Sequence, residues 1–188
     1  MKKILSAVVL MLVLSGCSGK DASQSFLDIR TAYLSADITL SADVRADYGD
    51  RCYEYSLSYT GDGKSGEVSI LSPEEISGIS ASIGENKKVS LKCGDTLIDT
   101  GILSGAGVPP VETLPLIVNA IREGYVSTGY TETLNGVEYI TVEIDETPAG
   151  ESDKIVYTLW FSAEDSALHK AEISTGGFVS VTAVFEEV

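Results

Sequence analysis

The stretch Ala36-Asp-Ile-Thr-Leu-Ser-Ala-Asp-Val-Arg-Ala-Asp-Tyr48 alternates apolar and polar residues with a strict period of two. Because successive side chains of a β-strand point to opposite faces of the sheet, this alternation predicts a long strand with one buried face. Residues 53–59 repeat the pattern after a turn at 48–51, and residues 67–71 follow a second turn at 61–64. Turns this short join antiparallel neighbours, so the three segments predict an antiparallel meander.

Two segments carry apolar residues at helical spacing instead. Residues 25–34 predict a short helix with Asp21 and Ser23 as candidate N-caps, and residues 111–123 predict a second helix that stops at Gly124. The apolar stripes are Phe26, Ile29 and Tyr33 in the first helix, and Leu114, Ile117, Val118 and Ile121 in the second. We therefore expect each helix to bury one side against the sheet.

The strand pattern returns after the second helix. Residues 125–134 and 137–144 flank Asn135-Gly136, the strongest short signal for a β-hairpin. Further strands are predicted at 80–83, 87–93, 96–99, 155–161, 169–174 and 178–185, with a helical turn at 73–76 capped by Ser72 and an irregular segment at 101–110. A long sheet with one dry face needs a cover. The predicted fold is α+β and mainly β: a curved antiparallel sheet, or incomplete β-barrel, covered by the N-terminal and central helices.

The N-terminus has the features of an export signal. Lys2 and Lys3 precede an uncharged apolar run that ends in Leu14-Ser-Gly-Cys17. A run of about eleven residues is too short for a membrane-spanning helix, which needs about 20, but it suits a secretory signal peptide. Cys17 directly after small residues resembles a bacterial lipobox. That resemblance implies a diacylglycerol on the Cys17 sulfur and cleavage before it.

The predicted organisation is a lipoprotein signal peptide at 1–16, a lipidated tether at 17–24 and a single domain at 25–188. Loss of the signal removes two of the 13 basic residues and none of the 28 acidic ones, so the net charge falls from −15 to −17. Nucleic-acid binding depends on basic residues that neutralise phosphates. A chain this acidic is therefore predicted to bind no nucleic acid, and its membrane attachment must come from the lipid.

Two cysteines remain after lipidation of Cys17. In an exported protein, Cys52 and Cys93 suggest one disulfide. However, Cys93 is in phase with the apolar residues of its strand and Cys52 is out of phase, and thiols on opposite faces cannot be bridged without a bulge or a register break. The alternative is two separate thiols, with Cys93 buried and Cys52 near a strand start.

The sequence carries no recognisable catalytic or metal-binding constellation. His169 is the single histidine, so the sequence has too few His and Cys residues for a metal set of the usual size and gives no basis for a Ser-His-Asp triad. Glu143, Asp145 and Glu146 form an acidic run that we interpret as a solvated strand end. We therefore predict a non-enzymatic protein without cofactor or metal.

The arrangement of elements resembles a known family. The chain is similar to the LolA/LolB-like lipoprotein-carrier superfamily in its N-terminal helix after the anchor, its meander and its Pro-containing central helix. Its ending is similar too, with Leu159-Trp-Phe161, Ala171-Glu-Ile173 and Val179–Phe185. The anchored cysteine resembles its membrane-bound members in Gram-positive, clostridia-like bacteria. The resemblance implies a half-open barrel whose apolar cavity holds acyl chains.

Two functions remain open. The first is a lipoprotein on the outer face of the cell membrane that binds or handles lipid between sheet and helices. The candidate lining residues are Ile38, Leu40, Val44, Tyr55, Leu57, Leu116, Ile117 and Ile121. The second is a scaffold or regulator with a filled core that docks a protein partner in the cell or spore envelope.

Overall fold

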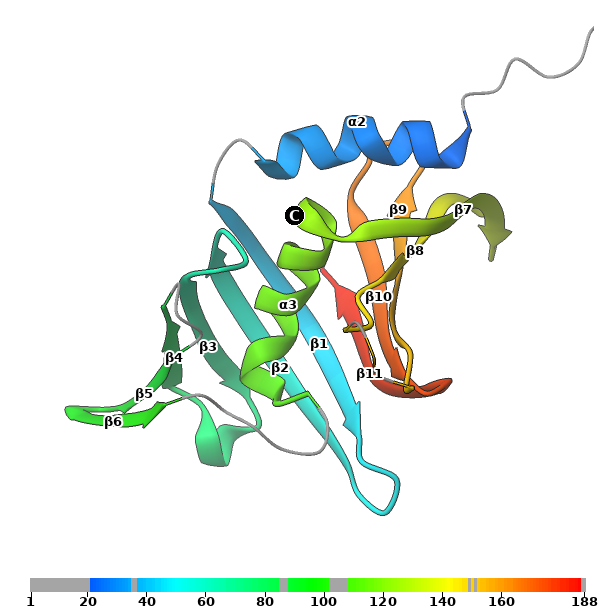
Figure 1. Ribbon diagram of the computed structural model, residues 1–188. Coiled ribbons are helices and arrows are strands. Elements are labelled where there is room, and N and C mark those ends of the chain that lie inside the picture. The colour runs from blue at the N-terminus through cyan, green and yellow to red at the C-terminus, as the bar shows by residue number, and fades with distance from the viewer. Residues whose placement is uncertain are drawn as a thin grey trace, which may run out of the picture.

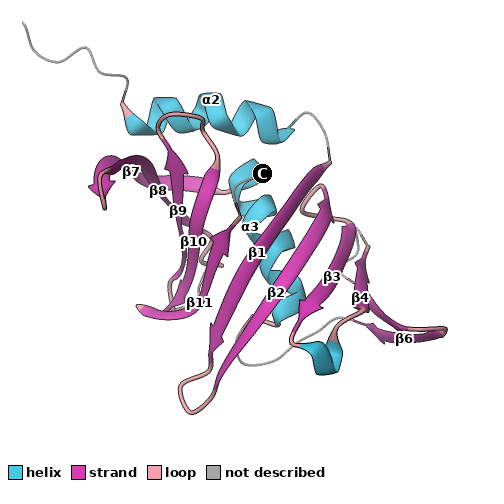
Figure 2. Cartoon of the chain, turned by 180° about the vertical axis from the view of Figure 1, so that it is seen from behind, coloured by secondary structure: helices cyan, strands magenta, loops and turns pink. Residues whose placement is uncertain are grey.

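The computed structural model describes residues 21–34, 37–84, 88–101, 108–148, 150 and 152–186. Eleven antiparallel strands form one open sheet in the order β6-β5-β4-β3-β2-β1-β11-β10-β9-β8-β7. Within the described residues, two α-helices accompany the sheet: α2 lies across the ends of several strands and α3 runs along one face (Figure 1). The predicted fold class is confirmed. We call the face that α3 covers the inner face and the opposite one the outer face. In the view from behind, strands β1 and β2 lie in front of α3 and show their outer face (Figure 2).

Helix α2 (Ala22–Leu34) begins three residues before the predicted start. The backbone N–H of Ser25 donates a hydrogen bond of 3.0 Å to the carbonyl of Asp21, which closes the first helical turn. Phe26 and Ile29 are buried as predicted. The Phe26 ring packs against Phe161 with ring centroids 5.5 Å apart. The Arg30 guanidinium also lies over the Phe26 ring, 4.9 Å from its centroid. These contacts fix α2 on the sheet.

The predicted meander is confirmed as β1 (Ile38–Asp47), β2 (Cys52–Gly61) and β3 (Gly66–Ser72). In β1, Ala42, Val44 and Ala46 point to the inner face and are buried, as the period of two predicts. The first strand also pairs with the last one, with Ala42 opposite Phe185. This pairing of the chain's two ends joins the N-terminal and C-terminal halves into one sheet.

The β2–β3 turn meets α3 through Lys64, whose Nζ lies 2.6 Å from the Glu123 carboxylate. The Tyr59 hydroxyl accepts a 2.7 Å hydrogen bond from the Gly63 N–H and donates one of 3.1 Å to the Ser65 carbonyl. Hydrogen bonds from the backbone N–H groups of Ser65 and Lys64 hold the pKa of Asp62 below its ordinary value. The turn therefore has fixed geometry where it meets the helix.

A short 3₁₀ helix, η1 (Glu74–Ile76), follows β3. Its N-cap position is Pro73, without a side-chain cap, so the prediction that Ser72 caps this turn is wrong. Ser72 instead ends β3, opposite Ser56. The next strands are β4 (Ile79–Ile83), β5 (Val89–Cys93) and β6 (Thr96–Gly101). Of the predicted irregular segment 101–110, residues 102–107 lie outside the described residues.

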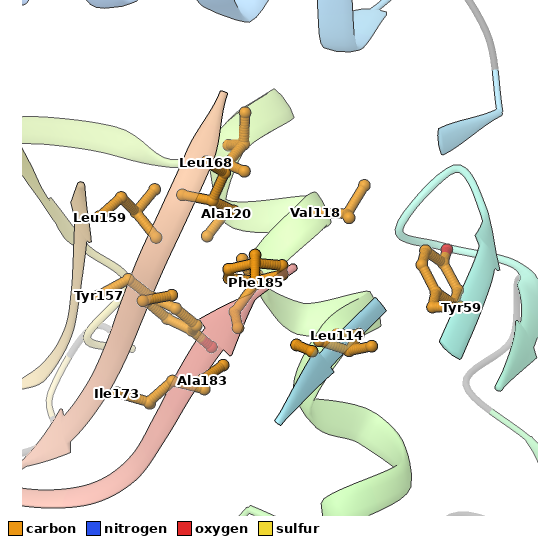
Figure 3. Close-up of a cluster of buried hydrophobic side chains, with 14 of the residues drawn as sticks. Tyr59, Leu114, Val118, Ala120, Tyr157, Leu159, Leu168, Ile173, Ala183 and Phe185 are labelled. Atoms are coloured by element: carbon orange, nitrogen blue, oxygen red, sulfur yellow. The ribbon is translucent and has the colours of Figure 1, made fainter. Parts of the chain in front are cut away.

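Helix α3 (Pro110–Glu123) is buried on most of its circumference. All four predicted stripe residues have no exposed surface, and Thr113, which directly precedes the first of them, is also fully buried. Gly124 ends the helix as predicted, but at φ −65°, so it needs no left-handed conformation. The helix therefore fills the inside of the curved sheet. Figure 3 shows Leu114, Val118 and Ala120 of α3 among side chains from the surrounding strands.

The C-terminal half is a second meander. Strands β7 (Tyr125–Leu134) and β8 (Val137–Asp145) meet at Asn135 and Gly136, whose φ angles of 53° and 85° confirm the predicted hairpin turn. The last strands are β9 (Ile155–Ser162), β10 (Leu168–Thr175) and β11 (Phe178–Phe185). Strand β9 is covered on both faces as predicted: Leu159 and Phe161 face inward, and Trp160 on the outer face is 9% exposed. The Trp160 Nε1 donates a 2.7 Å hydrogen bond to Glu132, and Lys170 Nζ lies 4.6 Å from its ring centroid.

Candidate functional site

The candidate site is a partly apolar cleft of about 630 Å³ at the strand ends beside the C-terminal part of α2, which we term the rim cleft. Its apolar walls come from Tyr33 of α2 and from four strands. The lining residues are Tyr33, Leu40, Ser41, Val137, Tyr139, Ser162, Glu164, Asp165, Ala167, Leu168, His169, Phe185 and Glu186. Clefts of roughly 300–1,000 Å³ are the size that holds small molecules.

The sheet order brings the apolar walls together. Leu40 lies on β1, Phe185 on β11 and Leu168 on β10, which are successive neighbours in the sheet. Phe185 is 7% exposed and Leu168 is 6% exposed. Figure 3 shows both side chains in the cluster of buried residues beside α3. The floor of the cleft is therefore the margin of the hydrophobic core.

Tyr33 forms the wall on the side of α2. Its ring meets Phe161 edge-on, with centroids 6.2 Å apart. Burial raises the pKa of the Tyr33 hydroxyl to about 12. The cause is loss of contact with water, which disfavours the charged form of the phenol. The wall formed by Tyr33 is thus suited to apolar contact.

Acidic residues stand at the mouth of the cleft. Glu164, Asp165 and Glu186 are exposed lining residues. The Ala167 N–H donates a 3.0 Å hydrogen bond to Asp165, and this bond, with one from Ser162, holds the pKa of Asp165 below its ordinary value. The single histidine, His169, packs edge-on against Tyr139 at 5.6 Å. The mouth is therefore negative around an aromatic and apolar interior.

The predicted lining residues divide into two groups. Val44, Leu57, Ile117 and Ile121 are at most 1% exposed and belong to the packed core. The other four, Ile38, Leu40, Tyr55 and Leu116, are half-buried and pack against that core. Leu40 is the predicted residue that reaches the rim cleft. The sequence did not predict the other lining residues of the rim cleft, because they lie at strand ends that the β1–β11 pairing brings together.

A second cleft lies on the outer face over β1, β2, β10 and β11. It encloses about 720 Å³, and its side chains include Asp43, Arg45, Glu54, Lys170 and Glu172. Lys170 Nζ lies 2.7 Å from Glu172, and the Ser56 hydroxyl donates a 2.6 Å hydrogen bond to Asp43. Because charged side chains line this second cleft, we consider the rim cleft the better candidate for an apolar ligand.

The cysteines form no disulfide in the described structure. Cys52 and Cys93 are both free and exposed. Cys52 is the first residue of β2, as the alternative of separate thiols predicts. Cys93 ends β5, where it is exposed, so the prediction of its burial is wrong. Cys17 lies outside the described residues.

The described residues offer little other chemistry. None of their His, Cys, Asp and Glu side chains gather in threes that could hold a metal ion. In the same part of the chain, each helix is too short or too polar to cross a membrane.

Comparisons with known proteins concern the N-terminus and the fold. Residues 1–18 match the model for the prokaryotic membrane lipoprotein lipid attachment site, which confirms the predicted lipid attachment signal. None of the curated proteins matches the sequence.

Solved structures similar to this chain include a LolA superfamily protein from Nitrosomonas europaea. It has 14% identity and a TM-score of 0.46, and the match covers 82% of this chain and 72% of that one. A DUF1329 family protein from Desulfovibrio piger has 12% identity and a TM-score of 0.50, with coverage of 89% and 91%. The likeness to these structures is one of fold alone. In this chain, the lipid attachment signal precedes an open antiparallel sheet with an N-terminal and a central helix.

Proposed function

We propose that this protein is a non-enzymatic extracytoplasmic lipoprotein that is anchored to the outer face of the cell membrane through diacylglyceryl Cys17 and binds a lipid acyl chain in the rim cleft. The observation that carries the proposal is the cleft itself. Tyr33, Leu40 and Phe185 offer apolar walls at an open margin of the sheet. Helix α2, which forms one wall, is also the described element closest in sequence to the lipid attachment site.

The mechanism is desolvation of the acyl chain. Each methylene that moves from water into the cleft contributes about 0.8 kcal/mol. The acidic mouth formed by Glu164, Asp165 and Glu186 repels an anionic headgroup. We therefore expect zwitterionic lipids to bind better than anionic ones, and salt to reduce this difference.

A scaffold or regulator of an envelope protein is the second candidate. The complete burial of Leu57, Ile117 and Ile121 favours it, because a filled interior leaves no room for a ligand at the predicted central position. Acyl binding at the rim does not require that central space. The two functions therefore differ in whether purified protein retains lipid.

The test is native mass spectrometry of the mature chain with Cys17→Ser, incubated with phosphatidylethanolamine or with phosphatidylglycerol. We expect a lipid adduct that is more abundant with the zwitterionic lipid. Val137→Arg places a cation in the rim cleft at a residue that is 43% exposed, and it should abolish the adduct. Val184→Arg is the matched control, because Val184 is 52% exposed and lies outside the rim cleft. An apo mass with both lipids would refute acyl binding and favour the protein-docking function.

A further inference from the structure

Three exposed apolar side chains lie beside the junction of α2 and β7. Leu27 and Leu34 of α2 are 46% and 57% exposed, and Tyr125 at the start of β7 is 76% exposed. We call these three residues the seam patch. Leu27 and Leu34 are seven positions apart, which is about two helical turns, so they share one flank of α2.

Contacts on both sides of Leu27 place this flank beside β7. The Arg30 Nη2 donates a 2.7 Å hydrogen bond to the carbonyl of Gly124, the residue before Tyr125. Near the other end of the helix, a Cβ on Gly129 would come within 2.6 Å of the Ser23 hydroxyl. Ser23 and Arg30 are four positions before and three positions after Leu27. The N-terminal part of β7 therefore runs beside the flank that carries the seam patch, and Figure 1 shows β7 passing next to α2.

The seam patch is close to the lipid along the chain. Three residues lie between Cys17 and Asp21, and the four residue steps from one to the other span at most about 14 Å. Leu27 lies five residues into α2, which adds about 8 Å along the helix axis at 1.5 Å per residue. A lipid on Cys17 therefore holds α2 within reach of the headgroup region of the bilayer.

We propose that the seam patch is a membrane-docking surface that seats α2 and the start of β7 in the interface of a bilayer with neutral headgroups. Leucine supplies apolar area to this layer, and tyrosine adds a hydroxyl that can stay in its wet zone. Two acyl chains already anchor the protein stably, so the patch has only to orient the domain. The high effective concentration of a tethered surface makes three side chains sufficient for that task. The proposal rests on lipid attachment at Cys17 and is independent of acyl binding in the rim cleft.

Other exposed apolar residues lie elsewhere and provide an internal control. Leu97 and Ile98 of β6 are 69% and 52% exposed, and Phe178 at the start of β11 is 51% exposed. Strand β6 and the β10–β11 turn stand at parts of the molecule away from α2 (Figure 1). We call Leu97, Ile98 and Phe178 the control set. Membrane docking through the seam patch should leave this set in water.

The experiment is hydroxyl-radical footprinting of the lipidated mature chain in phosphatidylcholine vesicles, compared with the Cys17→Ser chain mixed with the same vesicles. We expect lipidation to lower the reactivity of the seam patch several-fold and to leave the control set unchanged. The intact mass of the lipidated sample reports the diacylglycerol. Its absence would overturn the attachment at Cys17 and the docking together. Lipid present with an unprotected seam patch, or equal protection of both sets, would overturn the docking alone.

A variant pair completes the test. Leu27→Glu with Leu34→Glu, in the lipidated chain, should return Tyr125 to the reactivity that it has in the Cys17→Ser chain. Leu97→Glu with Ile98→Glu should leave Tyr125 protected. All four positions are exposed, so these variants are expected to fold. Persistent protection of Tyr125 in the first variant, or loss of its protection in the second, would contradict the proposal.

Discussion

Replacement of Ile117 by alanine tests whether the interior around α3 is packed or is an open cavity. Ile117 has no exposed surface and belongs to the core cluster. Three carbons are removed, and at about 0.8 kcal/mol each their lost burial costs about 2.4 kcal/mol. The void they leave adds up to about 2 kcal/mol if the core does not relax into it, at about 24 cal/mol per Å³. We therefore expect a loss of about 2.5–4.5 kcal/mol in the free energy of unfolding.

The assay is urea unfolding of the Cys17→Ser chain, followed by circular dichroism, with an unchanged slope required for the comparison. Leu116→Ala is the matched control. Leu116 is the preceding residue on the same helix and was predicted to line the same cavity, but it is half-buried and should cost about half as much. A loss below about 1 kcal/mol for Ile117→Ala would refute the packed interior, because a side chain facing an empty cavity has few neighbours to lose.

Three further predictions concern single contacts. Burial raises the Tyr33 pKa to about 12, above its ordinary value of 10, so the stability present below pH 10 should fall as the pH rises from 10 to 12. Tyr33→Phe should lessen that loss in unfolding curves recorded at alkaline pH. Gly63→Ala should cost at least about 1 kcal/mol more than Gly49→Ala in urea unfolding, because both glycines have φ +87° but only at Gly63 would a Cβ lie 2.7 Å from the Asn119 nitrogen. Glu132→Ala removes the carboxylate that accepts the hydrogen bond from Trp160, the single tryptophan, so the fluorescence emission should shift to longer wavelength and the free energy of unfolding should fall by about 1–3 kcal/mol. An unshifted emission would show that this hydrogen bond is dispensable.

Local patterns in the sequence were sufficient for most of the elements. The period of two in β1 and the Asn135-Gly136 signal predict geometry that neighbouring residues determine by themselves, and both are confirmed. The earlier start of α2 shows where such patterns are weaker. Residues 22–24 carry little apolar signal, yet Ala22 is buried and Ser23 lies against Gly129. Tertiary contact extends the helix there beyond what its own sequence indicates.

Long-range pairing limited what the sequence could say about the site. The rim cleft needs Leu40 of β1 beside Phe185 of β11, and these residues are near the two ends of the chain. No local period encodes that pairing, because an alternating strand can pair with any partner that shares its dry face. The cysteines show the same limit: periodicity assigned Cys93 to the inner face, but its place at the end of β5 leaves it exposed.

Periodicity also does not distinguish a core residue from the wall of a cavity, since both face away from water. The distinction depends on what occupies the space opposite. For Leu57 and Ile117 that space is filled, because α3 lies inside the curve of the sheet and is buried on most sides. At the rim the packing ends. Leu40 lies near the start of β1, Phe185 ends β11 and Tyr33 lies near the end of α2, and polar side chains line the cleft beside them. A cleft at this margin is thus a consequence of how the two ends of the chain meet, and it is available to a ligand without any rearrangement of the core.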